Sequence, residues 1–169
     1  MKTILSIFGL SLLLVGCQMQ TDNFAMDLFE KNSQTVLSEL DAFQNERFDK
    51  SIYAKDFTFL NTSFGEKDSI GIDVLEQQNE EMWKMYDFKL LTDPLVLLPG
   101  VDSETKLLDG SVRYYAEWEI TRTETDSTEA KRATLLLYES FDFDDKGKIQ
   151  IQQYYGDVAA LFMYLNSDL

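Results

Sequence analysis

The side chains in this sequence that could move a proton or bind a metal are mainly carboxylates and tyrosines. The 169 residues include 30 aspartates and glutamates, 8 tyrosines and one cysteine, but no histidine. Ser-His-Asp and Cys-His catalysis are therefore excluded, and so are zinc or iron sites that depend on imidazole. A glycine-rich phosphate loop of the G-x-x-x-x-G-K type is absent as well. The sequence predicts no metal site, no cofactor and no recognisable catalytic residue.

One acidic segment has part of the spacing of a calcium-binding loop. Asp142, Asp144 and Gly147 occupy the first, third and sixth positions of such a loop. However, Lys146 stands where an oxygen ligand is required, and Gln153 replaces the bidentate glutamate at the end of the loop. We expect a hairpin turn here instead, with Gly147 at a positive φ angle.

The single cysteine, Cys17, closely follows the longest apolar run, residues 4–15, which itself comes after the positively charged Lys2. This order is typical of a secretory signal. At about 1.5 Å per helical residue, the run is too short to cross a hydrocarbon layer of about 30 Å. Its end, "LVGC" (residues 14–17), resembles the bacterial lipoprotein signal, in which the chain is cut before the cysteine and the thiol is acylated. A plain signal peptide followed by an unmodified cysteine is the alternative.

The lipoprotein resemblance implies three parts. Residues 1–16 would be the signal peptide, residues 17–23 the lipidated cysteine and a tether, and residues 24–169 a single domain. The membrane would then be a partner through an N-terminal lipid anchor in the cell envelope. Gln18 is not the aspartate that resembles an inner-membrane retention signal, which favours the outer membrane, at its periplasmic or surface face.

The composition is strongly acidic, with 15 lysines and arginines against 30 acids and a net charge of −15 at pH 7. Such a surface repels phosphate backbones, so nucleic acid is not an expected partner. Hydrophobic residues make up 44% of the chain. This is enough to build the core of one domain.

The first part of the domain has helical periodicity. A long amphipathic helix is predicted from Asp22 to about Phe43. Its apolar stripe consists of Met26, Phe29, Val36, Leu37, Leu40 and Phe43. The residues between them, expected on the polar face, are Glu30, Lys31, Asn32, Glu39 and Asp41. A short helical piece at residues 51–55, a strand from Phe57 and a second helix from about Asp68 to Tyr86 complete this part.

The second part has the alternation of β-strands. Strands are expected at residues 88–98, 111–123, 132–143 and 148–155, followed by a closing helix at residues 158–165 with Asp157 as its cap. In the second strand one face is predicted to be buried, namely Val112, Tyr114, Ala116, Trp118 and Ile120. Helices followed by an antiparallel meander indicate an α+β fold, in which a twisted sheet covered by helices closes like a cone.

This order of elements resembles the nuclear transport factor 2-like (NTF2-like) superfamily, which includes the SnoaL-like polyketide cyclases and the ketosteroid isomerases. The segments that carry the resemblance are "YAKDFTF" (residues 53–59), "GSVRYYAEWEITR" (residues 110–122) and "DDKGKIQIQQYYGD" (residues 144–157). The resemblance implies an α+β, cone-shaped fold with N-terminal helices packed on a strongly curved, mainly antiparallel sheet. A lipocalin-like barrel is the main alternative.

The resemblance also implies a cavity, but not a catalytic base. In the steroid isomerases, the strand that begins with the Y-A-x-D motif ends in a carboxylate that takes a proton from carbon, and the equivalent residue here is Asn61. An amide has no basic site near neutral pH. An enzyme would therefore need Asp56, Asp93 or Asp157 to face the cavity. Our candidates for the cavity lining are Tyr53, Asp56, Asn61, Trp83, Tyr86, Tyr114, Trp118 and Tyr155. Most of these are aromatic, which suits a small hydrophobic ligand with a few polar groups.

Three functions follow from these expectations. The main one is a lipid-anchored envelope protein that is not an enzyme and binds a small ligand or a partner protein. The first alternative is a SnoaL-like isomerase, cyclase or dehydratase acting on a small hydrophobic substrate. The second alternative is a structural module in which the open face of the sheet pairs two copies into a homodimer.

Overall fold

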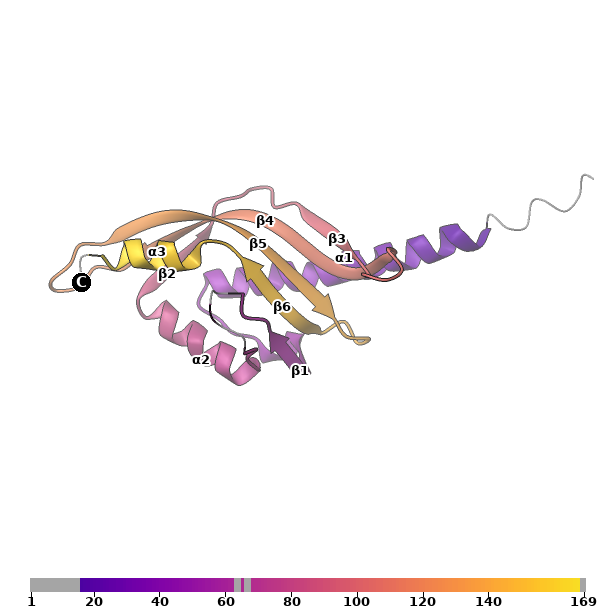
Figure 1. The fold of residues 1–169 in the computed structure, drawn as a ribbon, viewed down its shortest axis with the longest axis horizontal. Helices are drawn as coiled ribbons and strands as arrows, with labels where there is room; N and C mark the ends of the chain where they lie inside the picture. Colours follow the sequence, from indigo (N-terminus) through magenta and orange to yellow (C-terminus); the bar gives the residue numbers. More distant parts are fainter. Residues whose placement is uncertain (1–15, 63–64, 66–67, 168–169) are drawn as a thin grey trace, which may run out of the picture.

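The computed structural model describes residues 16–62, 65 and 68–167. The helices are α1 (Gly16–Gln44), α2 (Ile72–Trp83) and α3 (Val158–Leu165), with a short 3-10 helix η1 (Lys50–Ile52). The strands are β1 (Tyr53–Phe59), β2 (Tyr86–Leu90), β3 (Leu97–Val101), β4 (Leu108–Arg122), β5 (Lys131–Phe143) and β6 (Ile149–Tyr155). Figure 1 shows α1 and α2 on the same side of one curved sheet.

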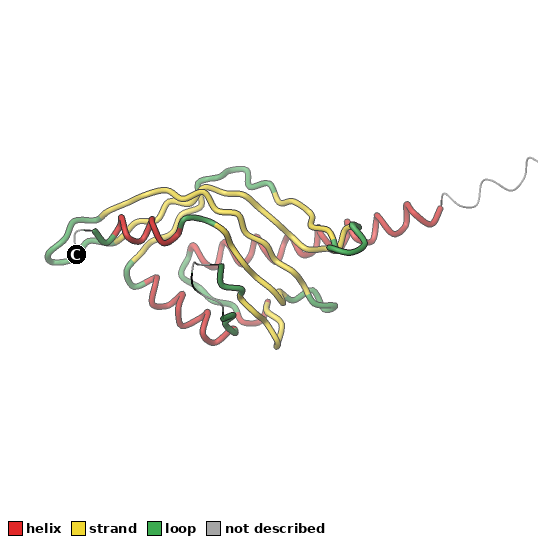
Figure 2. The backbone as a smooth tube through the Cα atoms, in the orientation of Figure 1, coloured by secondary structure: helices red, strands yellow, loops and turns green. Residues whose placement is uncertain are grey.

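The sheet has the order β1-β6-β5-β4-β2, and β3 also pairs with β4. Only β1 and β6 are parallel, and the remaining pairs are antiparallel. β2 and β3 share one edge of β4, because β2 pairs with its C-terminal half and β3 with its N-terminal half. Figure 2 shows the strands bending over α1, so that the sheet has a concave inner face and a convex outer face. The predicted α+β cone is thus confirmed.

The long strand β4 has the predicted alternation. Its inward side chains are buried, and the outward side chains lie on the convex face. The core formed by the inner face of the sheet and the helices includes the side chains most completely buried: Val36, Val112, Tyr114, Phe141, Ile149 and Leu165. Burying each of the apolar ones stabilises the fold by about 1.5–3 kcal/mol.

Several element boundaries differ from the sequence predictions. α1 begins at Gly16 and not at Asp22, so residues 18–23 continue the helix. The segment predicted as one strand at residues 88–98 is divided into β2 and β3. The piece expected to be helical at residues 51–55 mostly belongs to β1, which begins at Tyr53. None of the helices in the described part of the chain is both long and apolar enough to cross a bilayer.

Two predicted local features are present. The Asp157 side chain caps α3 by accepting a hydrogen bond from the Ala160 N–H at 3.3 Å. The acidic segment forms the β5–β6 hairpin, where Gly147 has a φ angle of 73°. The Asp144 carboxylate in that turn accepts hydrogen bonds from the N–H groups of Lys146 and Lys148. This carboxylate therefore stabilises the turn.

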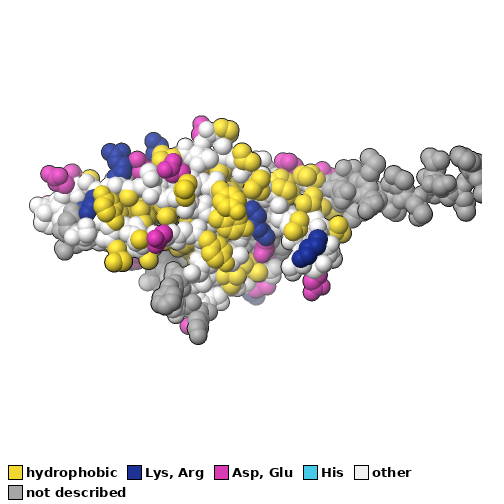
Figure 3. Space-filling view, turned by 45° about the horizontal axis from the view of Figure 1, so that its top comes forward, with side chains coloured by type: hydrophobic (Ala, Val, Ile, Leu, Met, Phe, Trp, Pro, Cys, Tyr) yellow, Lys and Arg dark blue, Asp and Glu magenta, His cyan; other side chains and the backbone are white. Residues whose placement is uncertain are grey.

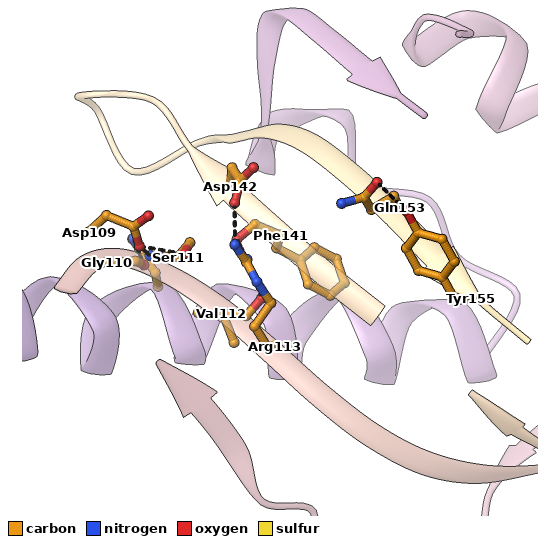
Figure 4. Close-up of polar contacts among 10 residues, drawn as sticks. Asp109, Gly110, Ser111, Val112, Arg113, Phe141, Asp142, Gln153 and Tyr155 are labelled. Carbon is orange, nitrogen blue, oxygen red and sulfur yellow. Dashed lines mark hydrogen bonds and ion pairs between the residues drawn. The ribbon is translucent and has the colours of Figure 1, made fainter. Parts of the chain in front are cut away.

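The outer face of the sheet carries ion pairs and aromatic side chains. Arg113 of β4 reaches across to Asp142 of β5 at 3.0 Å, and it also donates to the carbonyl groups of Val112 and Phe141 (Figure 4). Tyr155 lies on the same face and donates to the Gln153 side chain at 3.4 Å (Figure 4).

Candidate functional site

A cavity of about 550 Å³ lies between the concave face of the sheet and all three α-helices. Its walls are mostly apolar and include Leu40, Phe43, Leu75, Phe88, Ile120 and Leu161. Exposed side chains of α2, namely Gln77, Gln78 and Glu81, line the part nearest to solvent. This volume lies within the range of about 300–1,000 Å³ that is usual for small-molecule sites.

The deep end of the cavity, which we define as Glu39, Tyr114, Trp118, Glu139 and Gln152, is polar and buried. Glu39 comes from α1 and is 9% exposed, and Glu139 comes from β5 and is 6% exposed. Glu139 points inward because it alternates with Leu135 and Leu137, which also line the cavity. Two carboxyl groups from different elements thus lie at the buried end of a mostly apolar cavity.

The hydrogen bonds of the two carboxyl groups are unequal. Glu139 accepts a hydrogen bond from the Tyr114 hydroxyl and another, of 2.8 Å, from Gln152 Nε2. Glu39 accepts a longer one, of 3.3 Å, from the Tyr53 hydroxyl, and hydrogen bonding from the Gln152 side chain also acts to lower its pKa. Hydrogen bonds donated to a carboxylate favour its charged form. Glu139 is therefore better prepared to be ionised than Glu39.

Burial is the main cause of the altered acidity of this pair. It raises the pKa of Glu39 to about 8, and the nearby charge of Glu139 contributes to the same increase. Burial also raises the pKa of Glu139 to about 7, against the opposing effect of hydrogen bonds from Tyr114 and Gln152. Because the two carboxyl groups interact, they titrate as a pair, and Glu39 keeps its proton to a higher pH than Glu139 does.

The tyrosines of the site remain hydrogen-bond donors. Burial, followed by the nearby carboxylates, raises the pKa of both Tyr53 and Tyr114. Each phenol therefore keeps its proton over the ordinary pH range. Tyr53 donates a hydrogen bond to Glu39, and Tyr114 donates one to Glu139.

Only some of the predicted site residues lie at this cavity. Tyr114 and Trp118 line it, and Tyr53 contacts it indirectly through Glu39. Asp56 is exposed and accepts a hydrogen bond from Gln150 Nε2 at 2.9 Å, so the prediction that it faces the cavity is wrong. Asn61 is half-buried and is not part of the lining formed by the described residues.

The remaining predicted residues serve the core or the surface. Trp83 packs against Phe43, with ring centroids 5.7 Å apart. Tyr86 exchanges hydrogen bonds with the Asn166 side chain. Tyr155 is 52% exposed on the outer face, because it follows the inward Tyr154 in β6. The lining formed by the described residues includes none of the three.

Sequence reasoning missed both glutamates. It placed Glu39 on the polar face of the first helix and looked for a base among Asp56, Asp93 and Asp157, which lie elsewhere. A signal was available, because Glu39 lies three residues after Val36 and four before Phe43, on the apolar stripe. Glu139 likewise shares the inward face of its strand with Leu135 and Leu137. The expectation that the cavity lacks a suitably placed carboxylate is therefore wrong.

Cys17 lies in the first turn of α1, but the described side chains begin at residue 24. Its lipidation stays a prediction. In the described part of the chain, no three acidic, cysteine or histidine side chains converge as metal ligands would.

No protein-family model matches the sequence, and a comparison with curated proteins finds no relative. Solved structures do match. A candidate polyketide cyclase from Xanthomonas campestris is 16% identical, with a TM-score of 0.61, over 82% of this chain and 99% of that one. An NTF2-like protein from Burkholderia xenovorans is 13% identical, with a TM-score of 0.59, over 81% of this chain and 97% of that one.

A third match is an LEH-like epoxide hydrolase from Mycobacterium tuberculosis. It is 21% identical, with a TM-score of 0.56, over 80% of this chain and 90% of that one. SnoaL-like candidate cyclases are also among the matches. Identities this low establish the architecture and leave the chemistry to be argued from the site. The domain of this chain therefore has the NTF2-like fold of the SnoaL-like polyketide cyclases.

Proposed function

We propose that the chain is an acid–base enzyme, of the SnoaL-like isomerase, cyclase or dehydratase kind, that acts on a small and largely apolar substrate. The observation that carries this proposal is the pair of buried carboxyl groups, Glu39 and Glu139, at the deep end of an apolar cavity. Buried acids with raised pKa values are typical of sites for proton transfer.

The unequal surroundings of the two groups assign their roles. Glu139 accepts the shorter hydrogen bonds and has the lower pKa, so it is the base, whereas Glu39 has the higher pKa and keeps its proton as the acid. With a ketone in the cavity, the Glu139 carboxylate takes a proton from the carbon next to the carbonyl group. Glu39 gives its proton to the carbonyl oxygen, which produces an enol. The pair as a whole keeps one proton, now on Glu139, and proton transfer in the reverse sense restores the starting state.

The walls of the cavity determine which substrates fit this chemistry. Apolar side chains line most of the surface, and the described lining contains no lysine or arginine. A negatively charged substrate would approach two carboxyl groups without a compensating cation. Neutral molecules are therefore the favoured substrates.

The known proteins of similar structure support an enzyme more than a binding module. Those named above include cyclase candidates and an epoxide hydrolase, beside one protein described only as NTF2-like. A protein that only binds a ligand would need the same apolar cavity, but not two acids of raised pKa. The enzyme therefore replaces the non-catalytic binding module as our leading function.

The test is hydrogen exchange at carbon in D₂O. Tetralone serves as a neutral ketone, and its loss of α-hydrogen signal is followed by NMR with the wild type, Glu39→Gln and Glu139→Gln. We expect exchange above the solvent rate, lowered at least about a hundredfold in Glu139→Gln. Glu30→Gln, on the exposed side of the same helix, is the matched control and should exchange as the wild type does.

Two other outcomes would change the assignment. Tetralone that binds without any exchange above the solvent rate would contradict the enzyme and favour the binding module. Exchange that continues in both Glu39→Gln and Glu139→Gln would contradict the roles given to this pair. Styrene oxide, tested in parallel, would distinguish epoxide opening from proton abstraction at carbon.

We also propose that Cys17 carries a lipid that anchors the domain in the cell envelope, at the outer membrane. Support comes from the sequence "LVGC" and the apolar run before it. Several acyl chains would bury many methylene groups, at about 0.8 kcal/mol each. Cys17→Ser should move the protein to the soluble envelope fraction, and continued membrane attachment of this variant would contradict lipidation.

A second candidate function, homodimer formation, is favoured by an aromatic row on the outer face. Tyr115, Tyr138 and Tyr155 lie side by side on β4, β5 and β6, with ring centroids 4.9 and 6.1 Å apart. Leu136 on β5 is 76% exposed. Figure 3 shows hydrophobic side chains gathered across this face of the molecule.

We propose a second copy of the chain as the occupant of this face. The net charge of −15 makes most surfaces of two copies repel each other, whereas Arg113 and Arg132 on this face are each paired with an acid. Leu136→Glu should convert a dimer to a monomer in analytical ultracentrifugation. Met85→Glu, which changes an exposed side chain after α2, should leave the dimer intact. A wild type that is monomeric at high concentration would contradict this proposal.

A further inference from the structure

Two buried polar atoms at the deep end lack a hydrogen-bond partner among the described residues. One is Trp118 Nε1, which can only donate, and the other is Gln152 Oε1, which can only accept. Both residues are 5% exposed and both line the cavity. Buried polar atoms are normally paired. An occupant of the cavity is therefore the natural source of their partners.

The two residues lie on the strands to either side of the proposed base, because β4 carries Trp118, β6 carries Gln152 and β5 between them carries Glu139. Trp118 Nε1 lies near the Tyr114 hydroxyl but meets no acceptor with hydrogen-bonding geometry, and that hydroxyl donates to Glu139. On the other side, Gln152 donates from Nε2 to Glu139 at 2.8 Å. This bond fixes the orientation of the amide, since a carboxylate accepts only from its nitrogen. The oxygen Oε1 is left for the occupant.

We infer that the cavity binds its ligand through a hydroxyl group that accepts a hydrogen bond from Trp118 Nε1 and donates one to Gln152 Oε1. A carbonyl, ether or epoxide oxygen can only accept, and an ammonium group can only donate. A hydroxyl group does both and satisfies both atoms. This inference rests on the proposed function, because the hydroxyl group would hold the substrate beside Glu39 and Glu139.

The rest of the cavity defines the class of ligand further. An alcohol is uncharged, as the two carboxyl groups and the lack of lysine or arginine in the described lining require. The apolar walls then cover the hydrocarbon part. The ligand is thus a neutral amphiphile with a buried hydroxyl group and not a fatty acid or an amine.

Four probes of matched chain length test this. n-Octanol donates and accepts, n-octyl methyl ether only accepts, n-octyl chloride forms neither bond well, and octanoate adds a negative charge. Dissociation constants are measured by isothermal titration calorimetry. One hydrogen bond to a neutral group corresponds to roughly a fivefold to tenfold difference in affinity. We expect octanol to bind more tightly than the ether by that factor, the ether more tightly than the chloride, and octanoate most weakly at pH 8.

Two variants assign each preference to one atom. Trp118→Phe removes the donor and should abolish the preference for ether over chloride while keeping that for octanol over ether. Gln152→Met removes the acceptor and should abolish the preference for octanol over ether. Trp83→Phe is the matched control, because Trp83 Nε1 is also buried without a partner but lies outside the described lining. Trp83→Phe should change neither preference. If Gln152→Met does not fold, the comparison of Trp118→Phe with Trp83→Phe still tests whether Trp118 Nε1 binds the ligand.

The outcomes separate this inference from the proposed function. Equal affinities for octanol, ether and chloride in the wild type would overturn the hydroxyl site, since water would then already serve both atoms. Equal effects of Trp118→Phe and Trp83→Phe would overturn it as well. An octanol preference with no hydrogen exchange on tetralone contradicts the proposed function alone, whereas exchange without any octanol preference contradicts the hydroxyl site alone.

Discussion

Tyr114 and Glu139 are directly opposite each other on β4 and β5, and the Tyr114 hydroxyl donates to the Glu139 carboxylate on the inner face of the sheet. Tyr114 is fully buried, and its own pKa is raised mainly by burial and then by that carboxylate. The β4–β5 register therefore places a permanent donor on the proposed base.

Tyr114→Phe should raise the pKa of Glu139 further. The Tyr114 hydrogen bond stabilises the charged carboxylate, and the variant lacks this bond. The pH dependence of tetralone exchange should shift upward, and the free energy of unfolding should fall by about 1–3 kcal/mol. Exchange rates between pH 5 and 10 and urea denaturation measure the two effects. Tyr115→Phe, one residue away on the outer face, should change neither, and an unshifted pH profile in Tyr114→Phe would contradict the assignment of Glu139 as base.

Stability should decrease as the pH rises from about 4.5 to about 8. Glu39 and Glu139 have pKa values near 4.5 when unfolded and about 8 and 7 when folded, so the folded state holds more protons in this window. Unfolding is then favoured by rising pH, with a slope of up to about 1.4 kcal/mol per pH unit for each group. Urea denaturation at several pH values measures the slope.

Glu39→Gln should flatten this pH dependence and make the protein more stable than the wild type at pH 8. The amide keeps the approximate shape of the side chain and cannot ionise. Glu30→Gln changes an exposed acid in the same helix and should preserve the slope of the wild type. A wild-type stability that is constant between pH 5 and 8 would show that the two carboxyl groups are not buried in solution.

Phe141→Ala should destabilise the fold strongly. Phe141 is completely buried on β5, and truncation of such a side chain leaves a cavity that costs about 3–5 kcal/mol. Leu136→Ala on the same strand changes a side chain that is 76% exposed and should cost less than about 1 kcal/mol. The midpoints of urea denaturation compare the two, and similar losses would contradict the assignment of inner and outer faces.

Asp56→Asn should leave tetralone exchange unchanged. Asp56 is exposed and pairs with Gln150, away from the described lining of the cavity. The measured rate should agree with that of the wild type within a factor of two, roughly the scatter of surface substitutions. A loss comparable with that of Glu139→Gln would contradict Glu139 as the base and indicate Asp56 instead.

The sequence was sufficient to predict the architecture because its strongest patterns are long. The alternation of side chains in β4 correctly predicted the buried and the exposed face of the sheet, and Asp157 correctly predicted where α3 begins. Glu39 and Glu139 were missed because glutamate is normally exposed, and this general preference outweighed the spacing that aligns both residues with apolar neighbours. Only the fold shows that α1 and β5 bring the two carboxyl groups into one cavity. The gap between β2 and β3 was missed although Thr92, Asp93 and Pro94 interrupt the apolar residues there, and an aspartate followed by a proline is a turn signal.

The alternation of β4 gives adjacent residues different surroundings. Tyr114 lines the cavity, and Tyr115, joined to it by one peptide bond, belongs to the aromatic row on the outer face. Any shift of this strand that accommodates a ligand inside is therefore also a shift of the surface outside. In a homodimer built on that surface, such a shift in one subunit would also change its contact with the other.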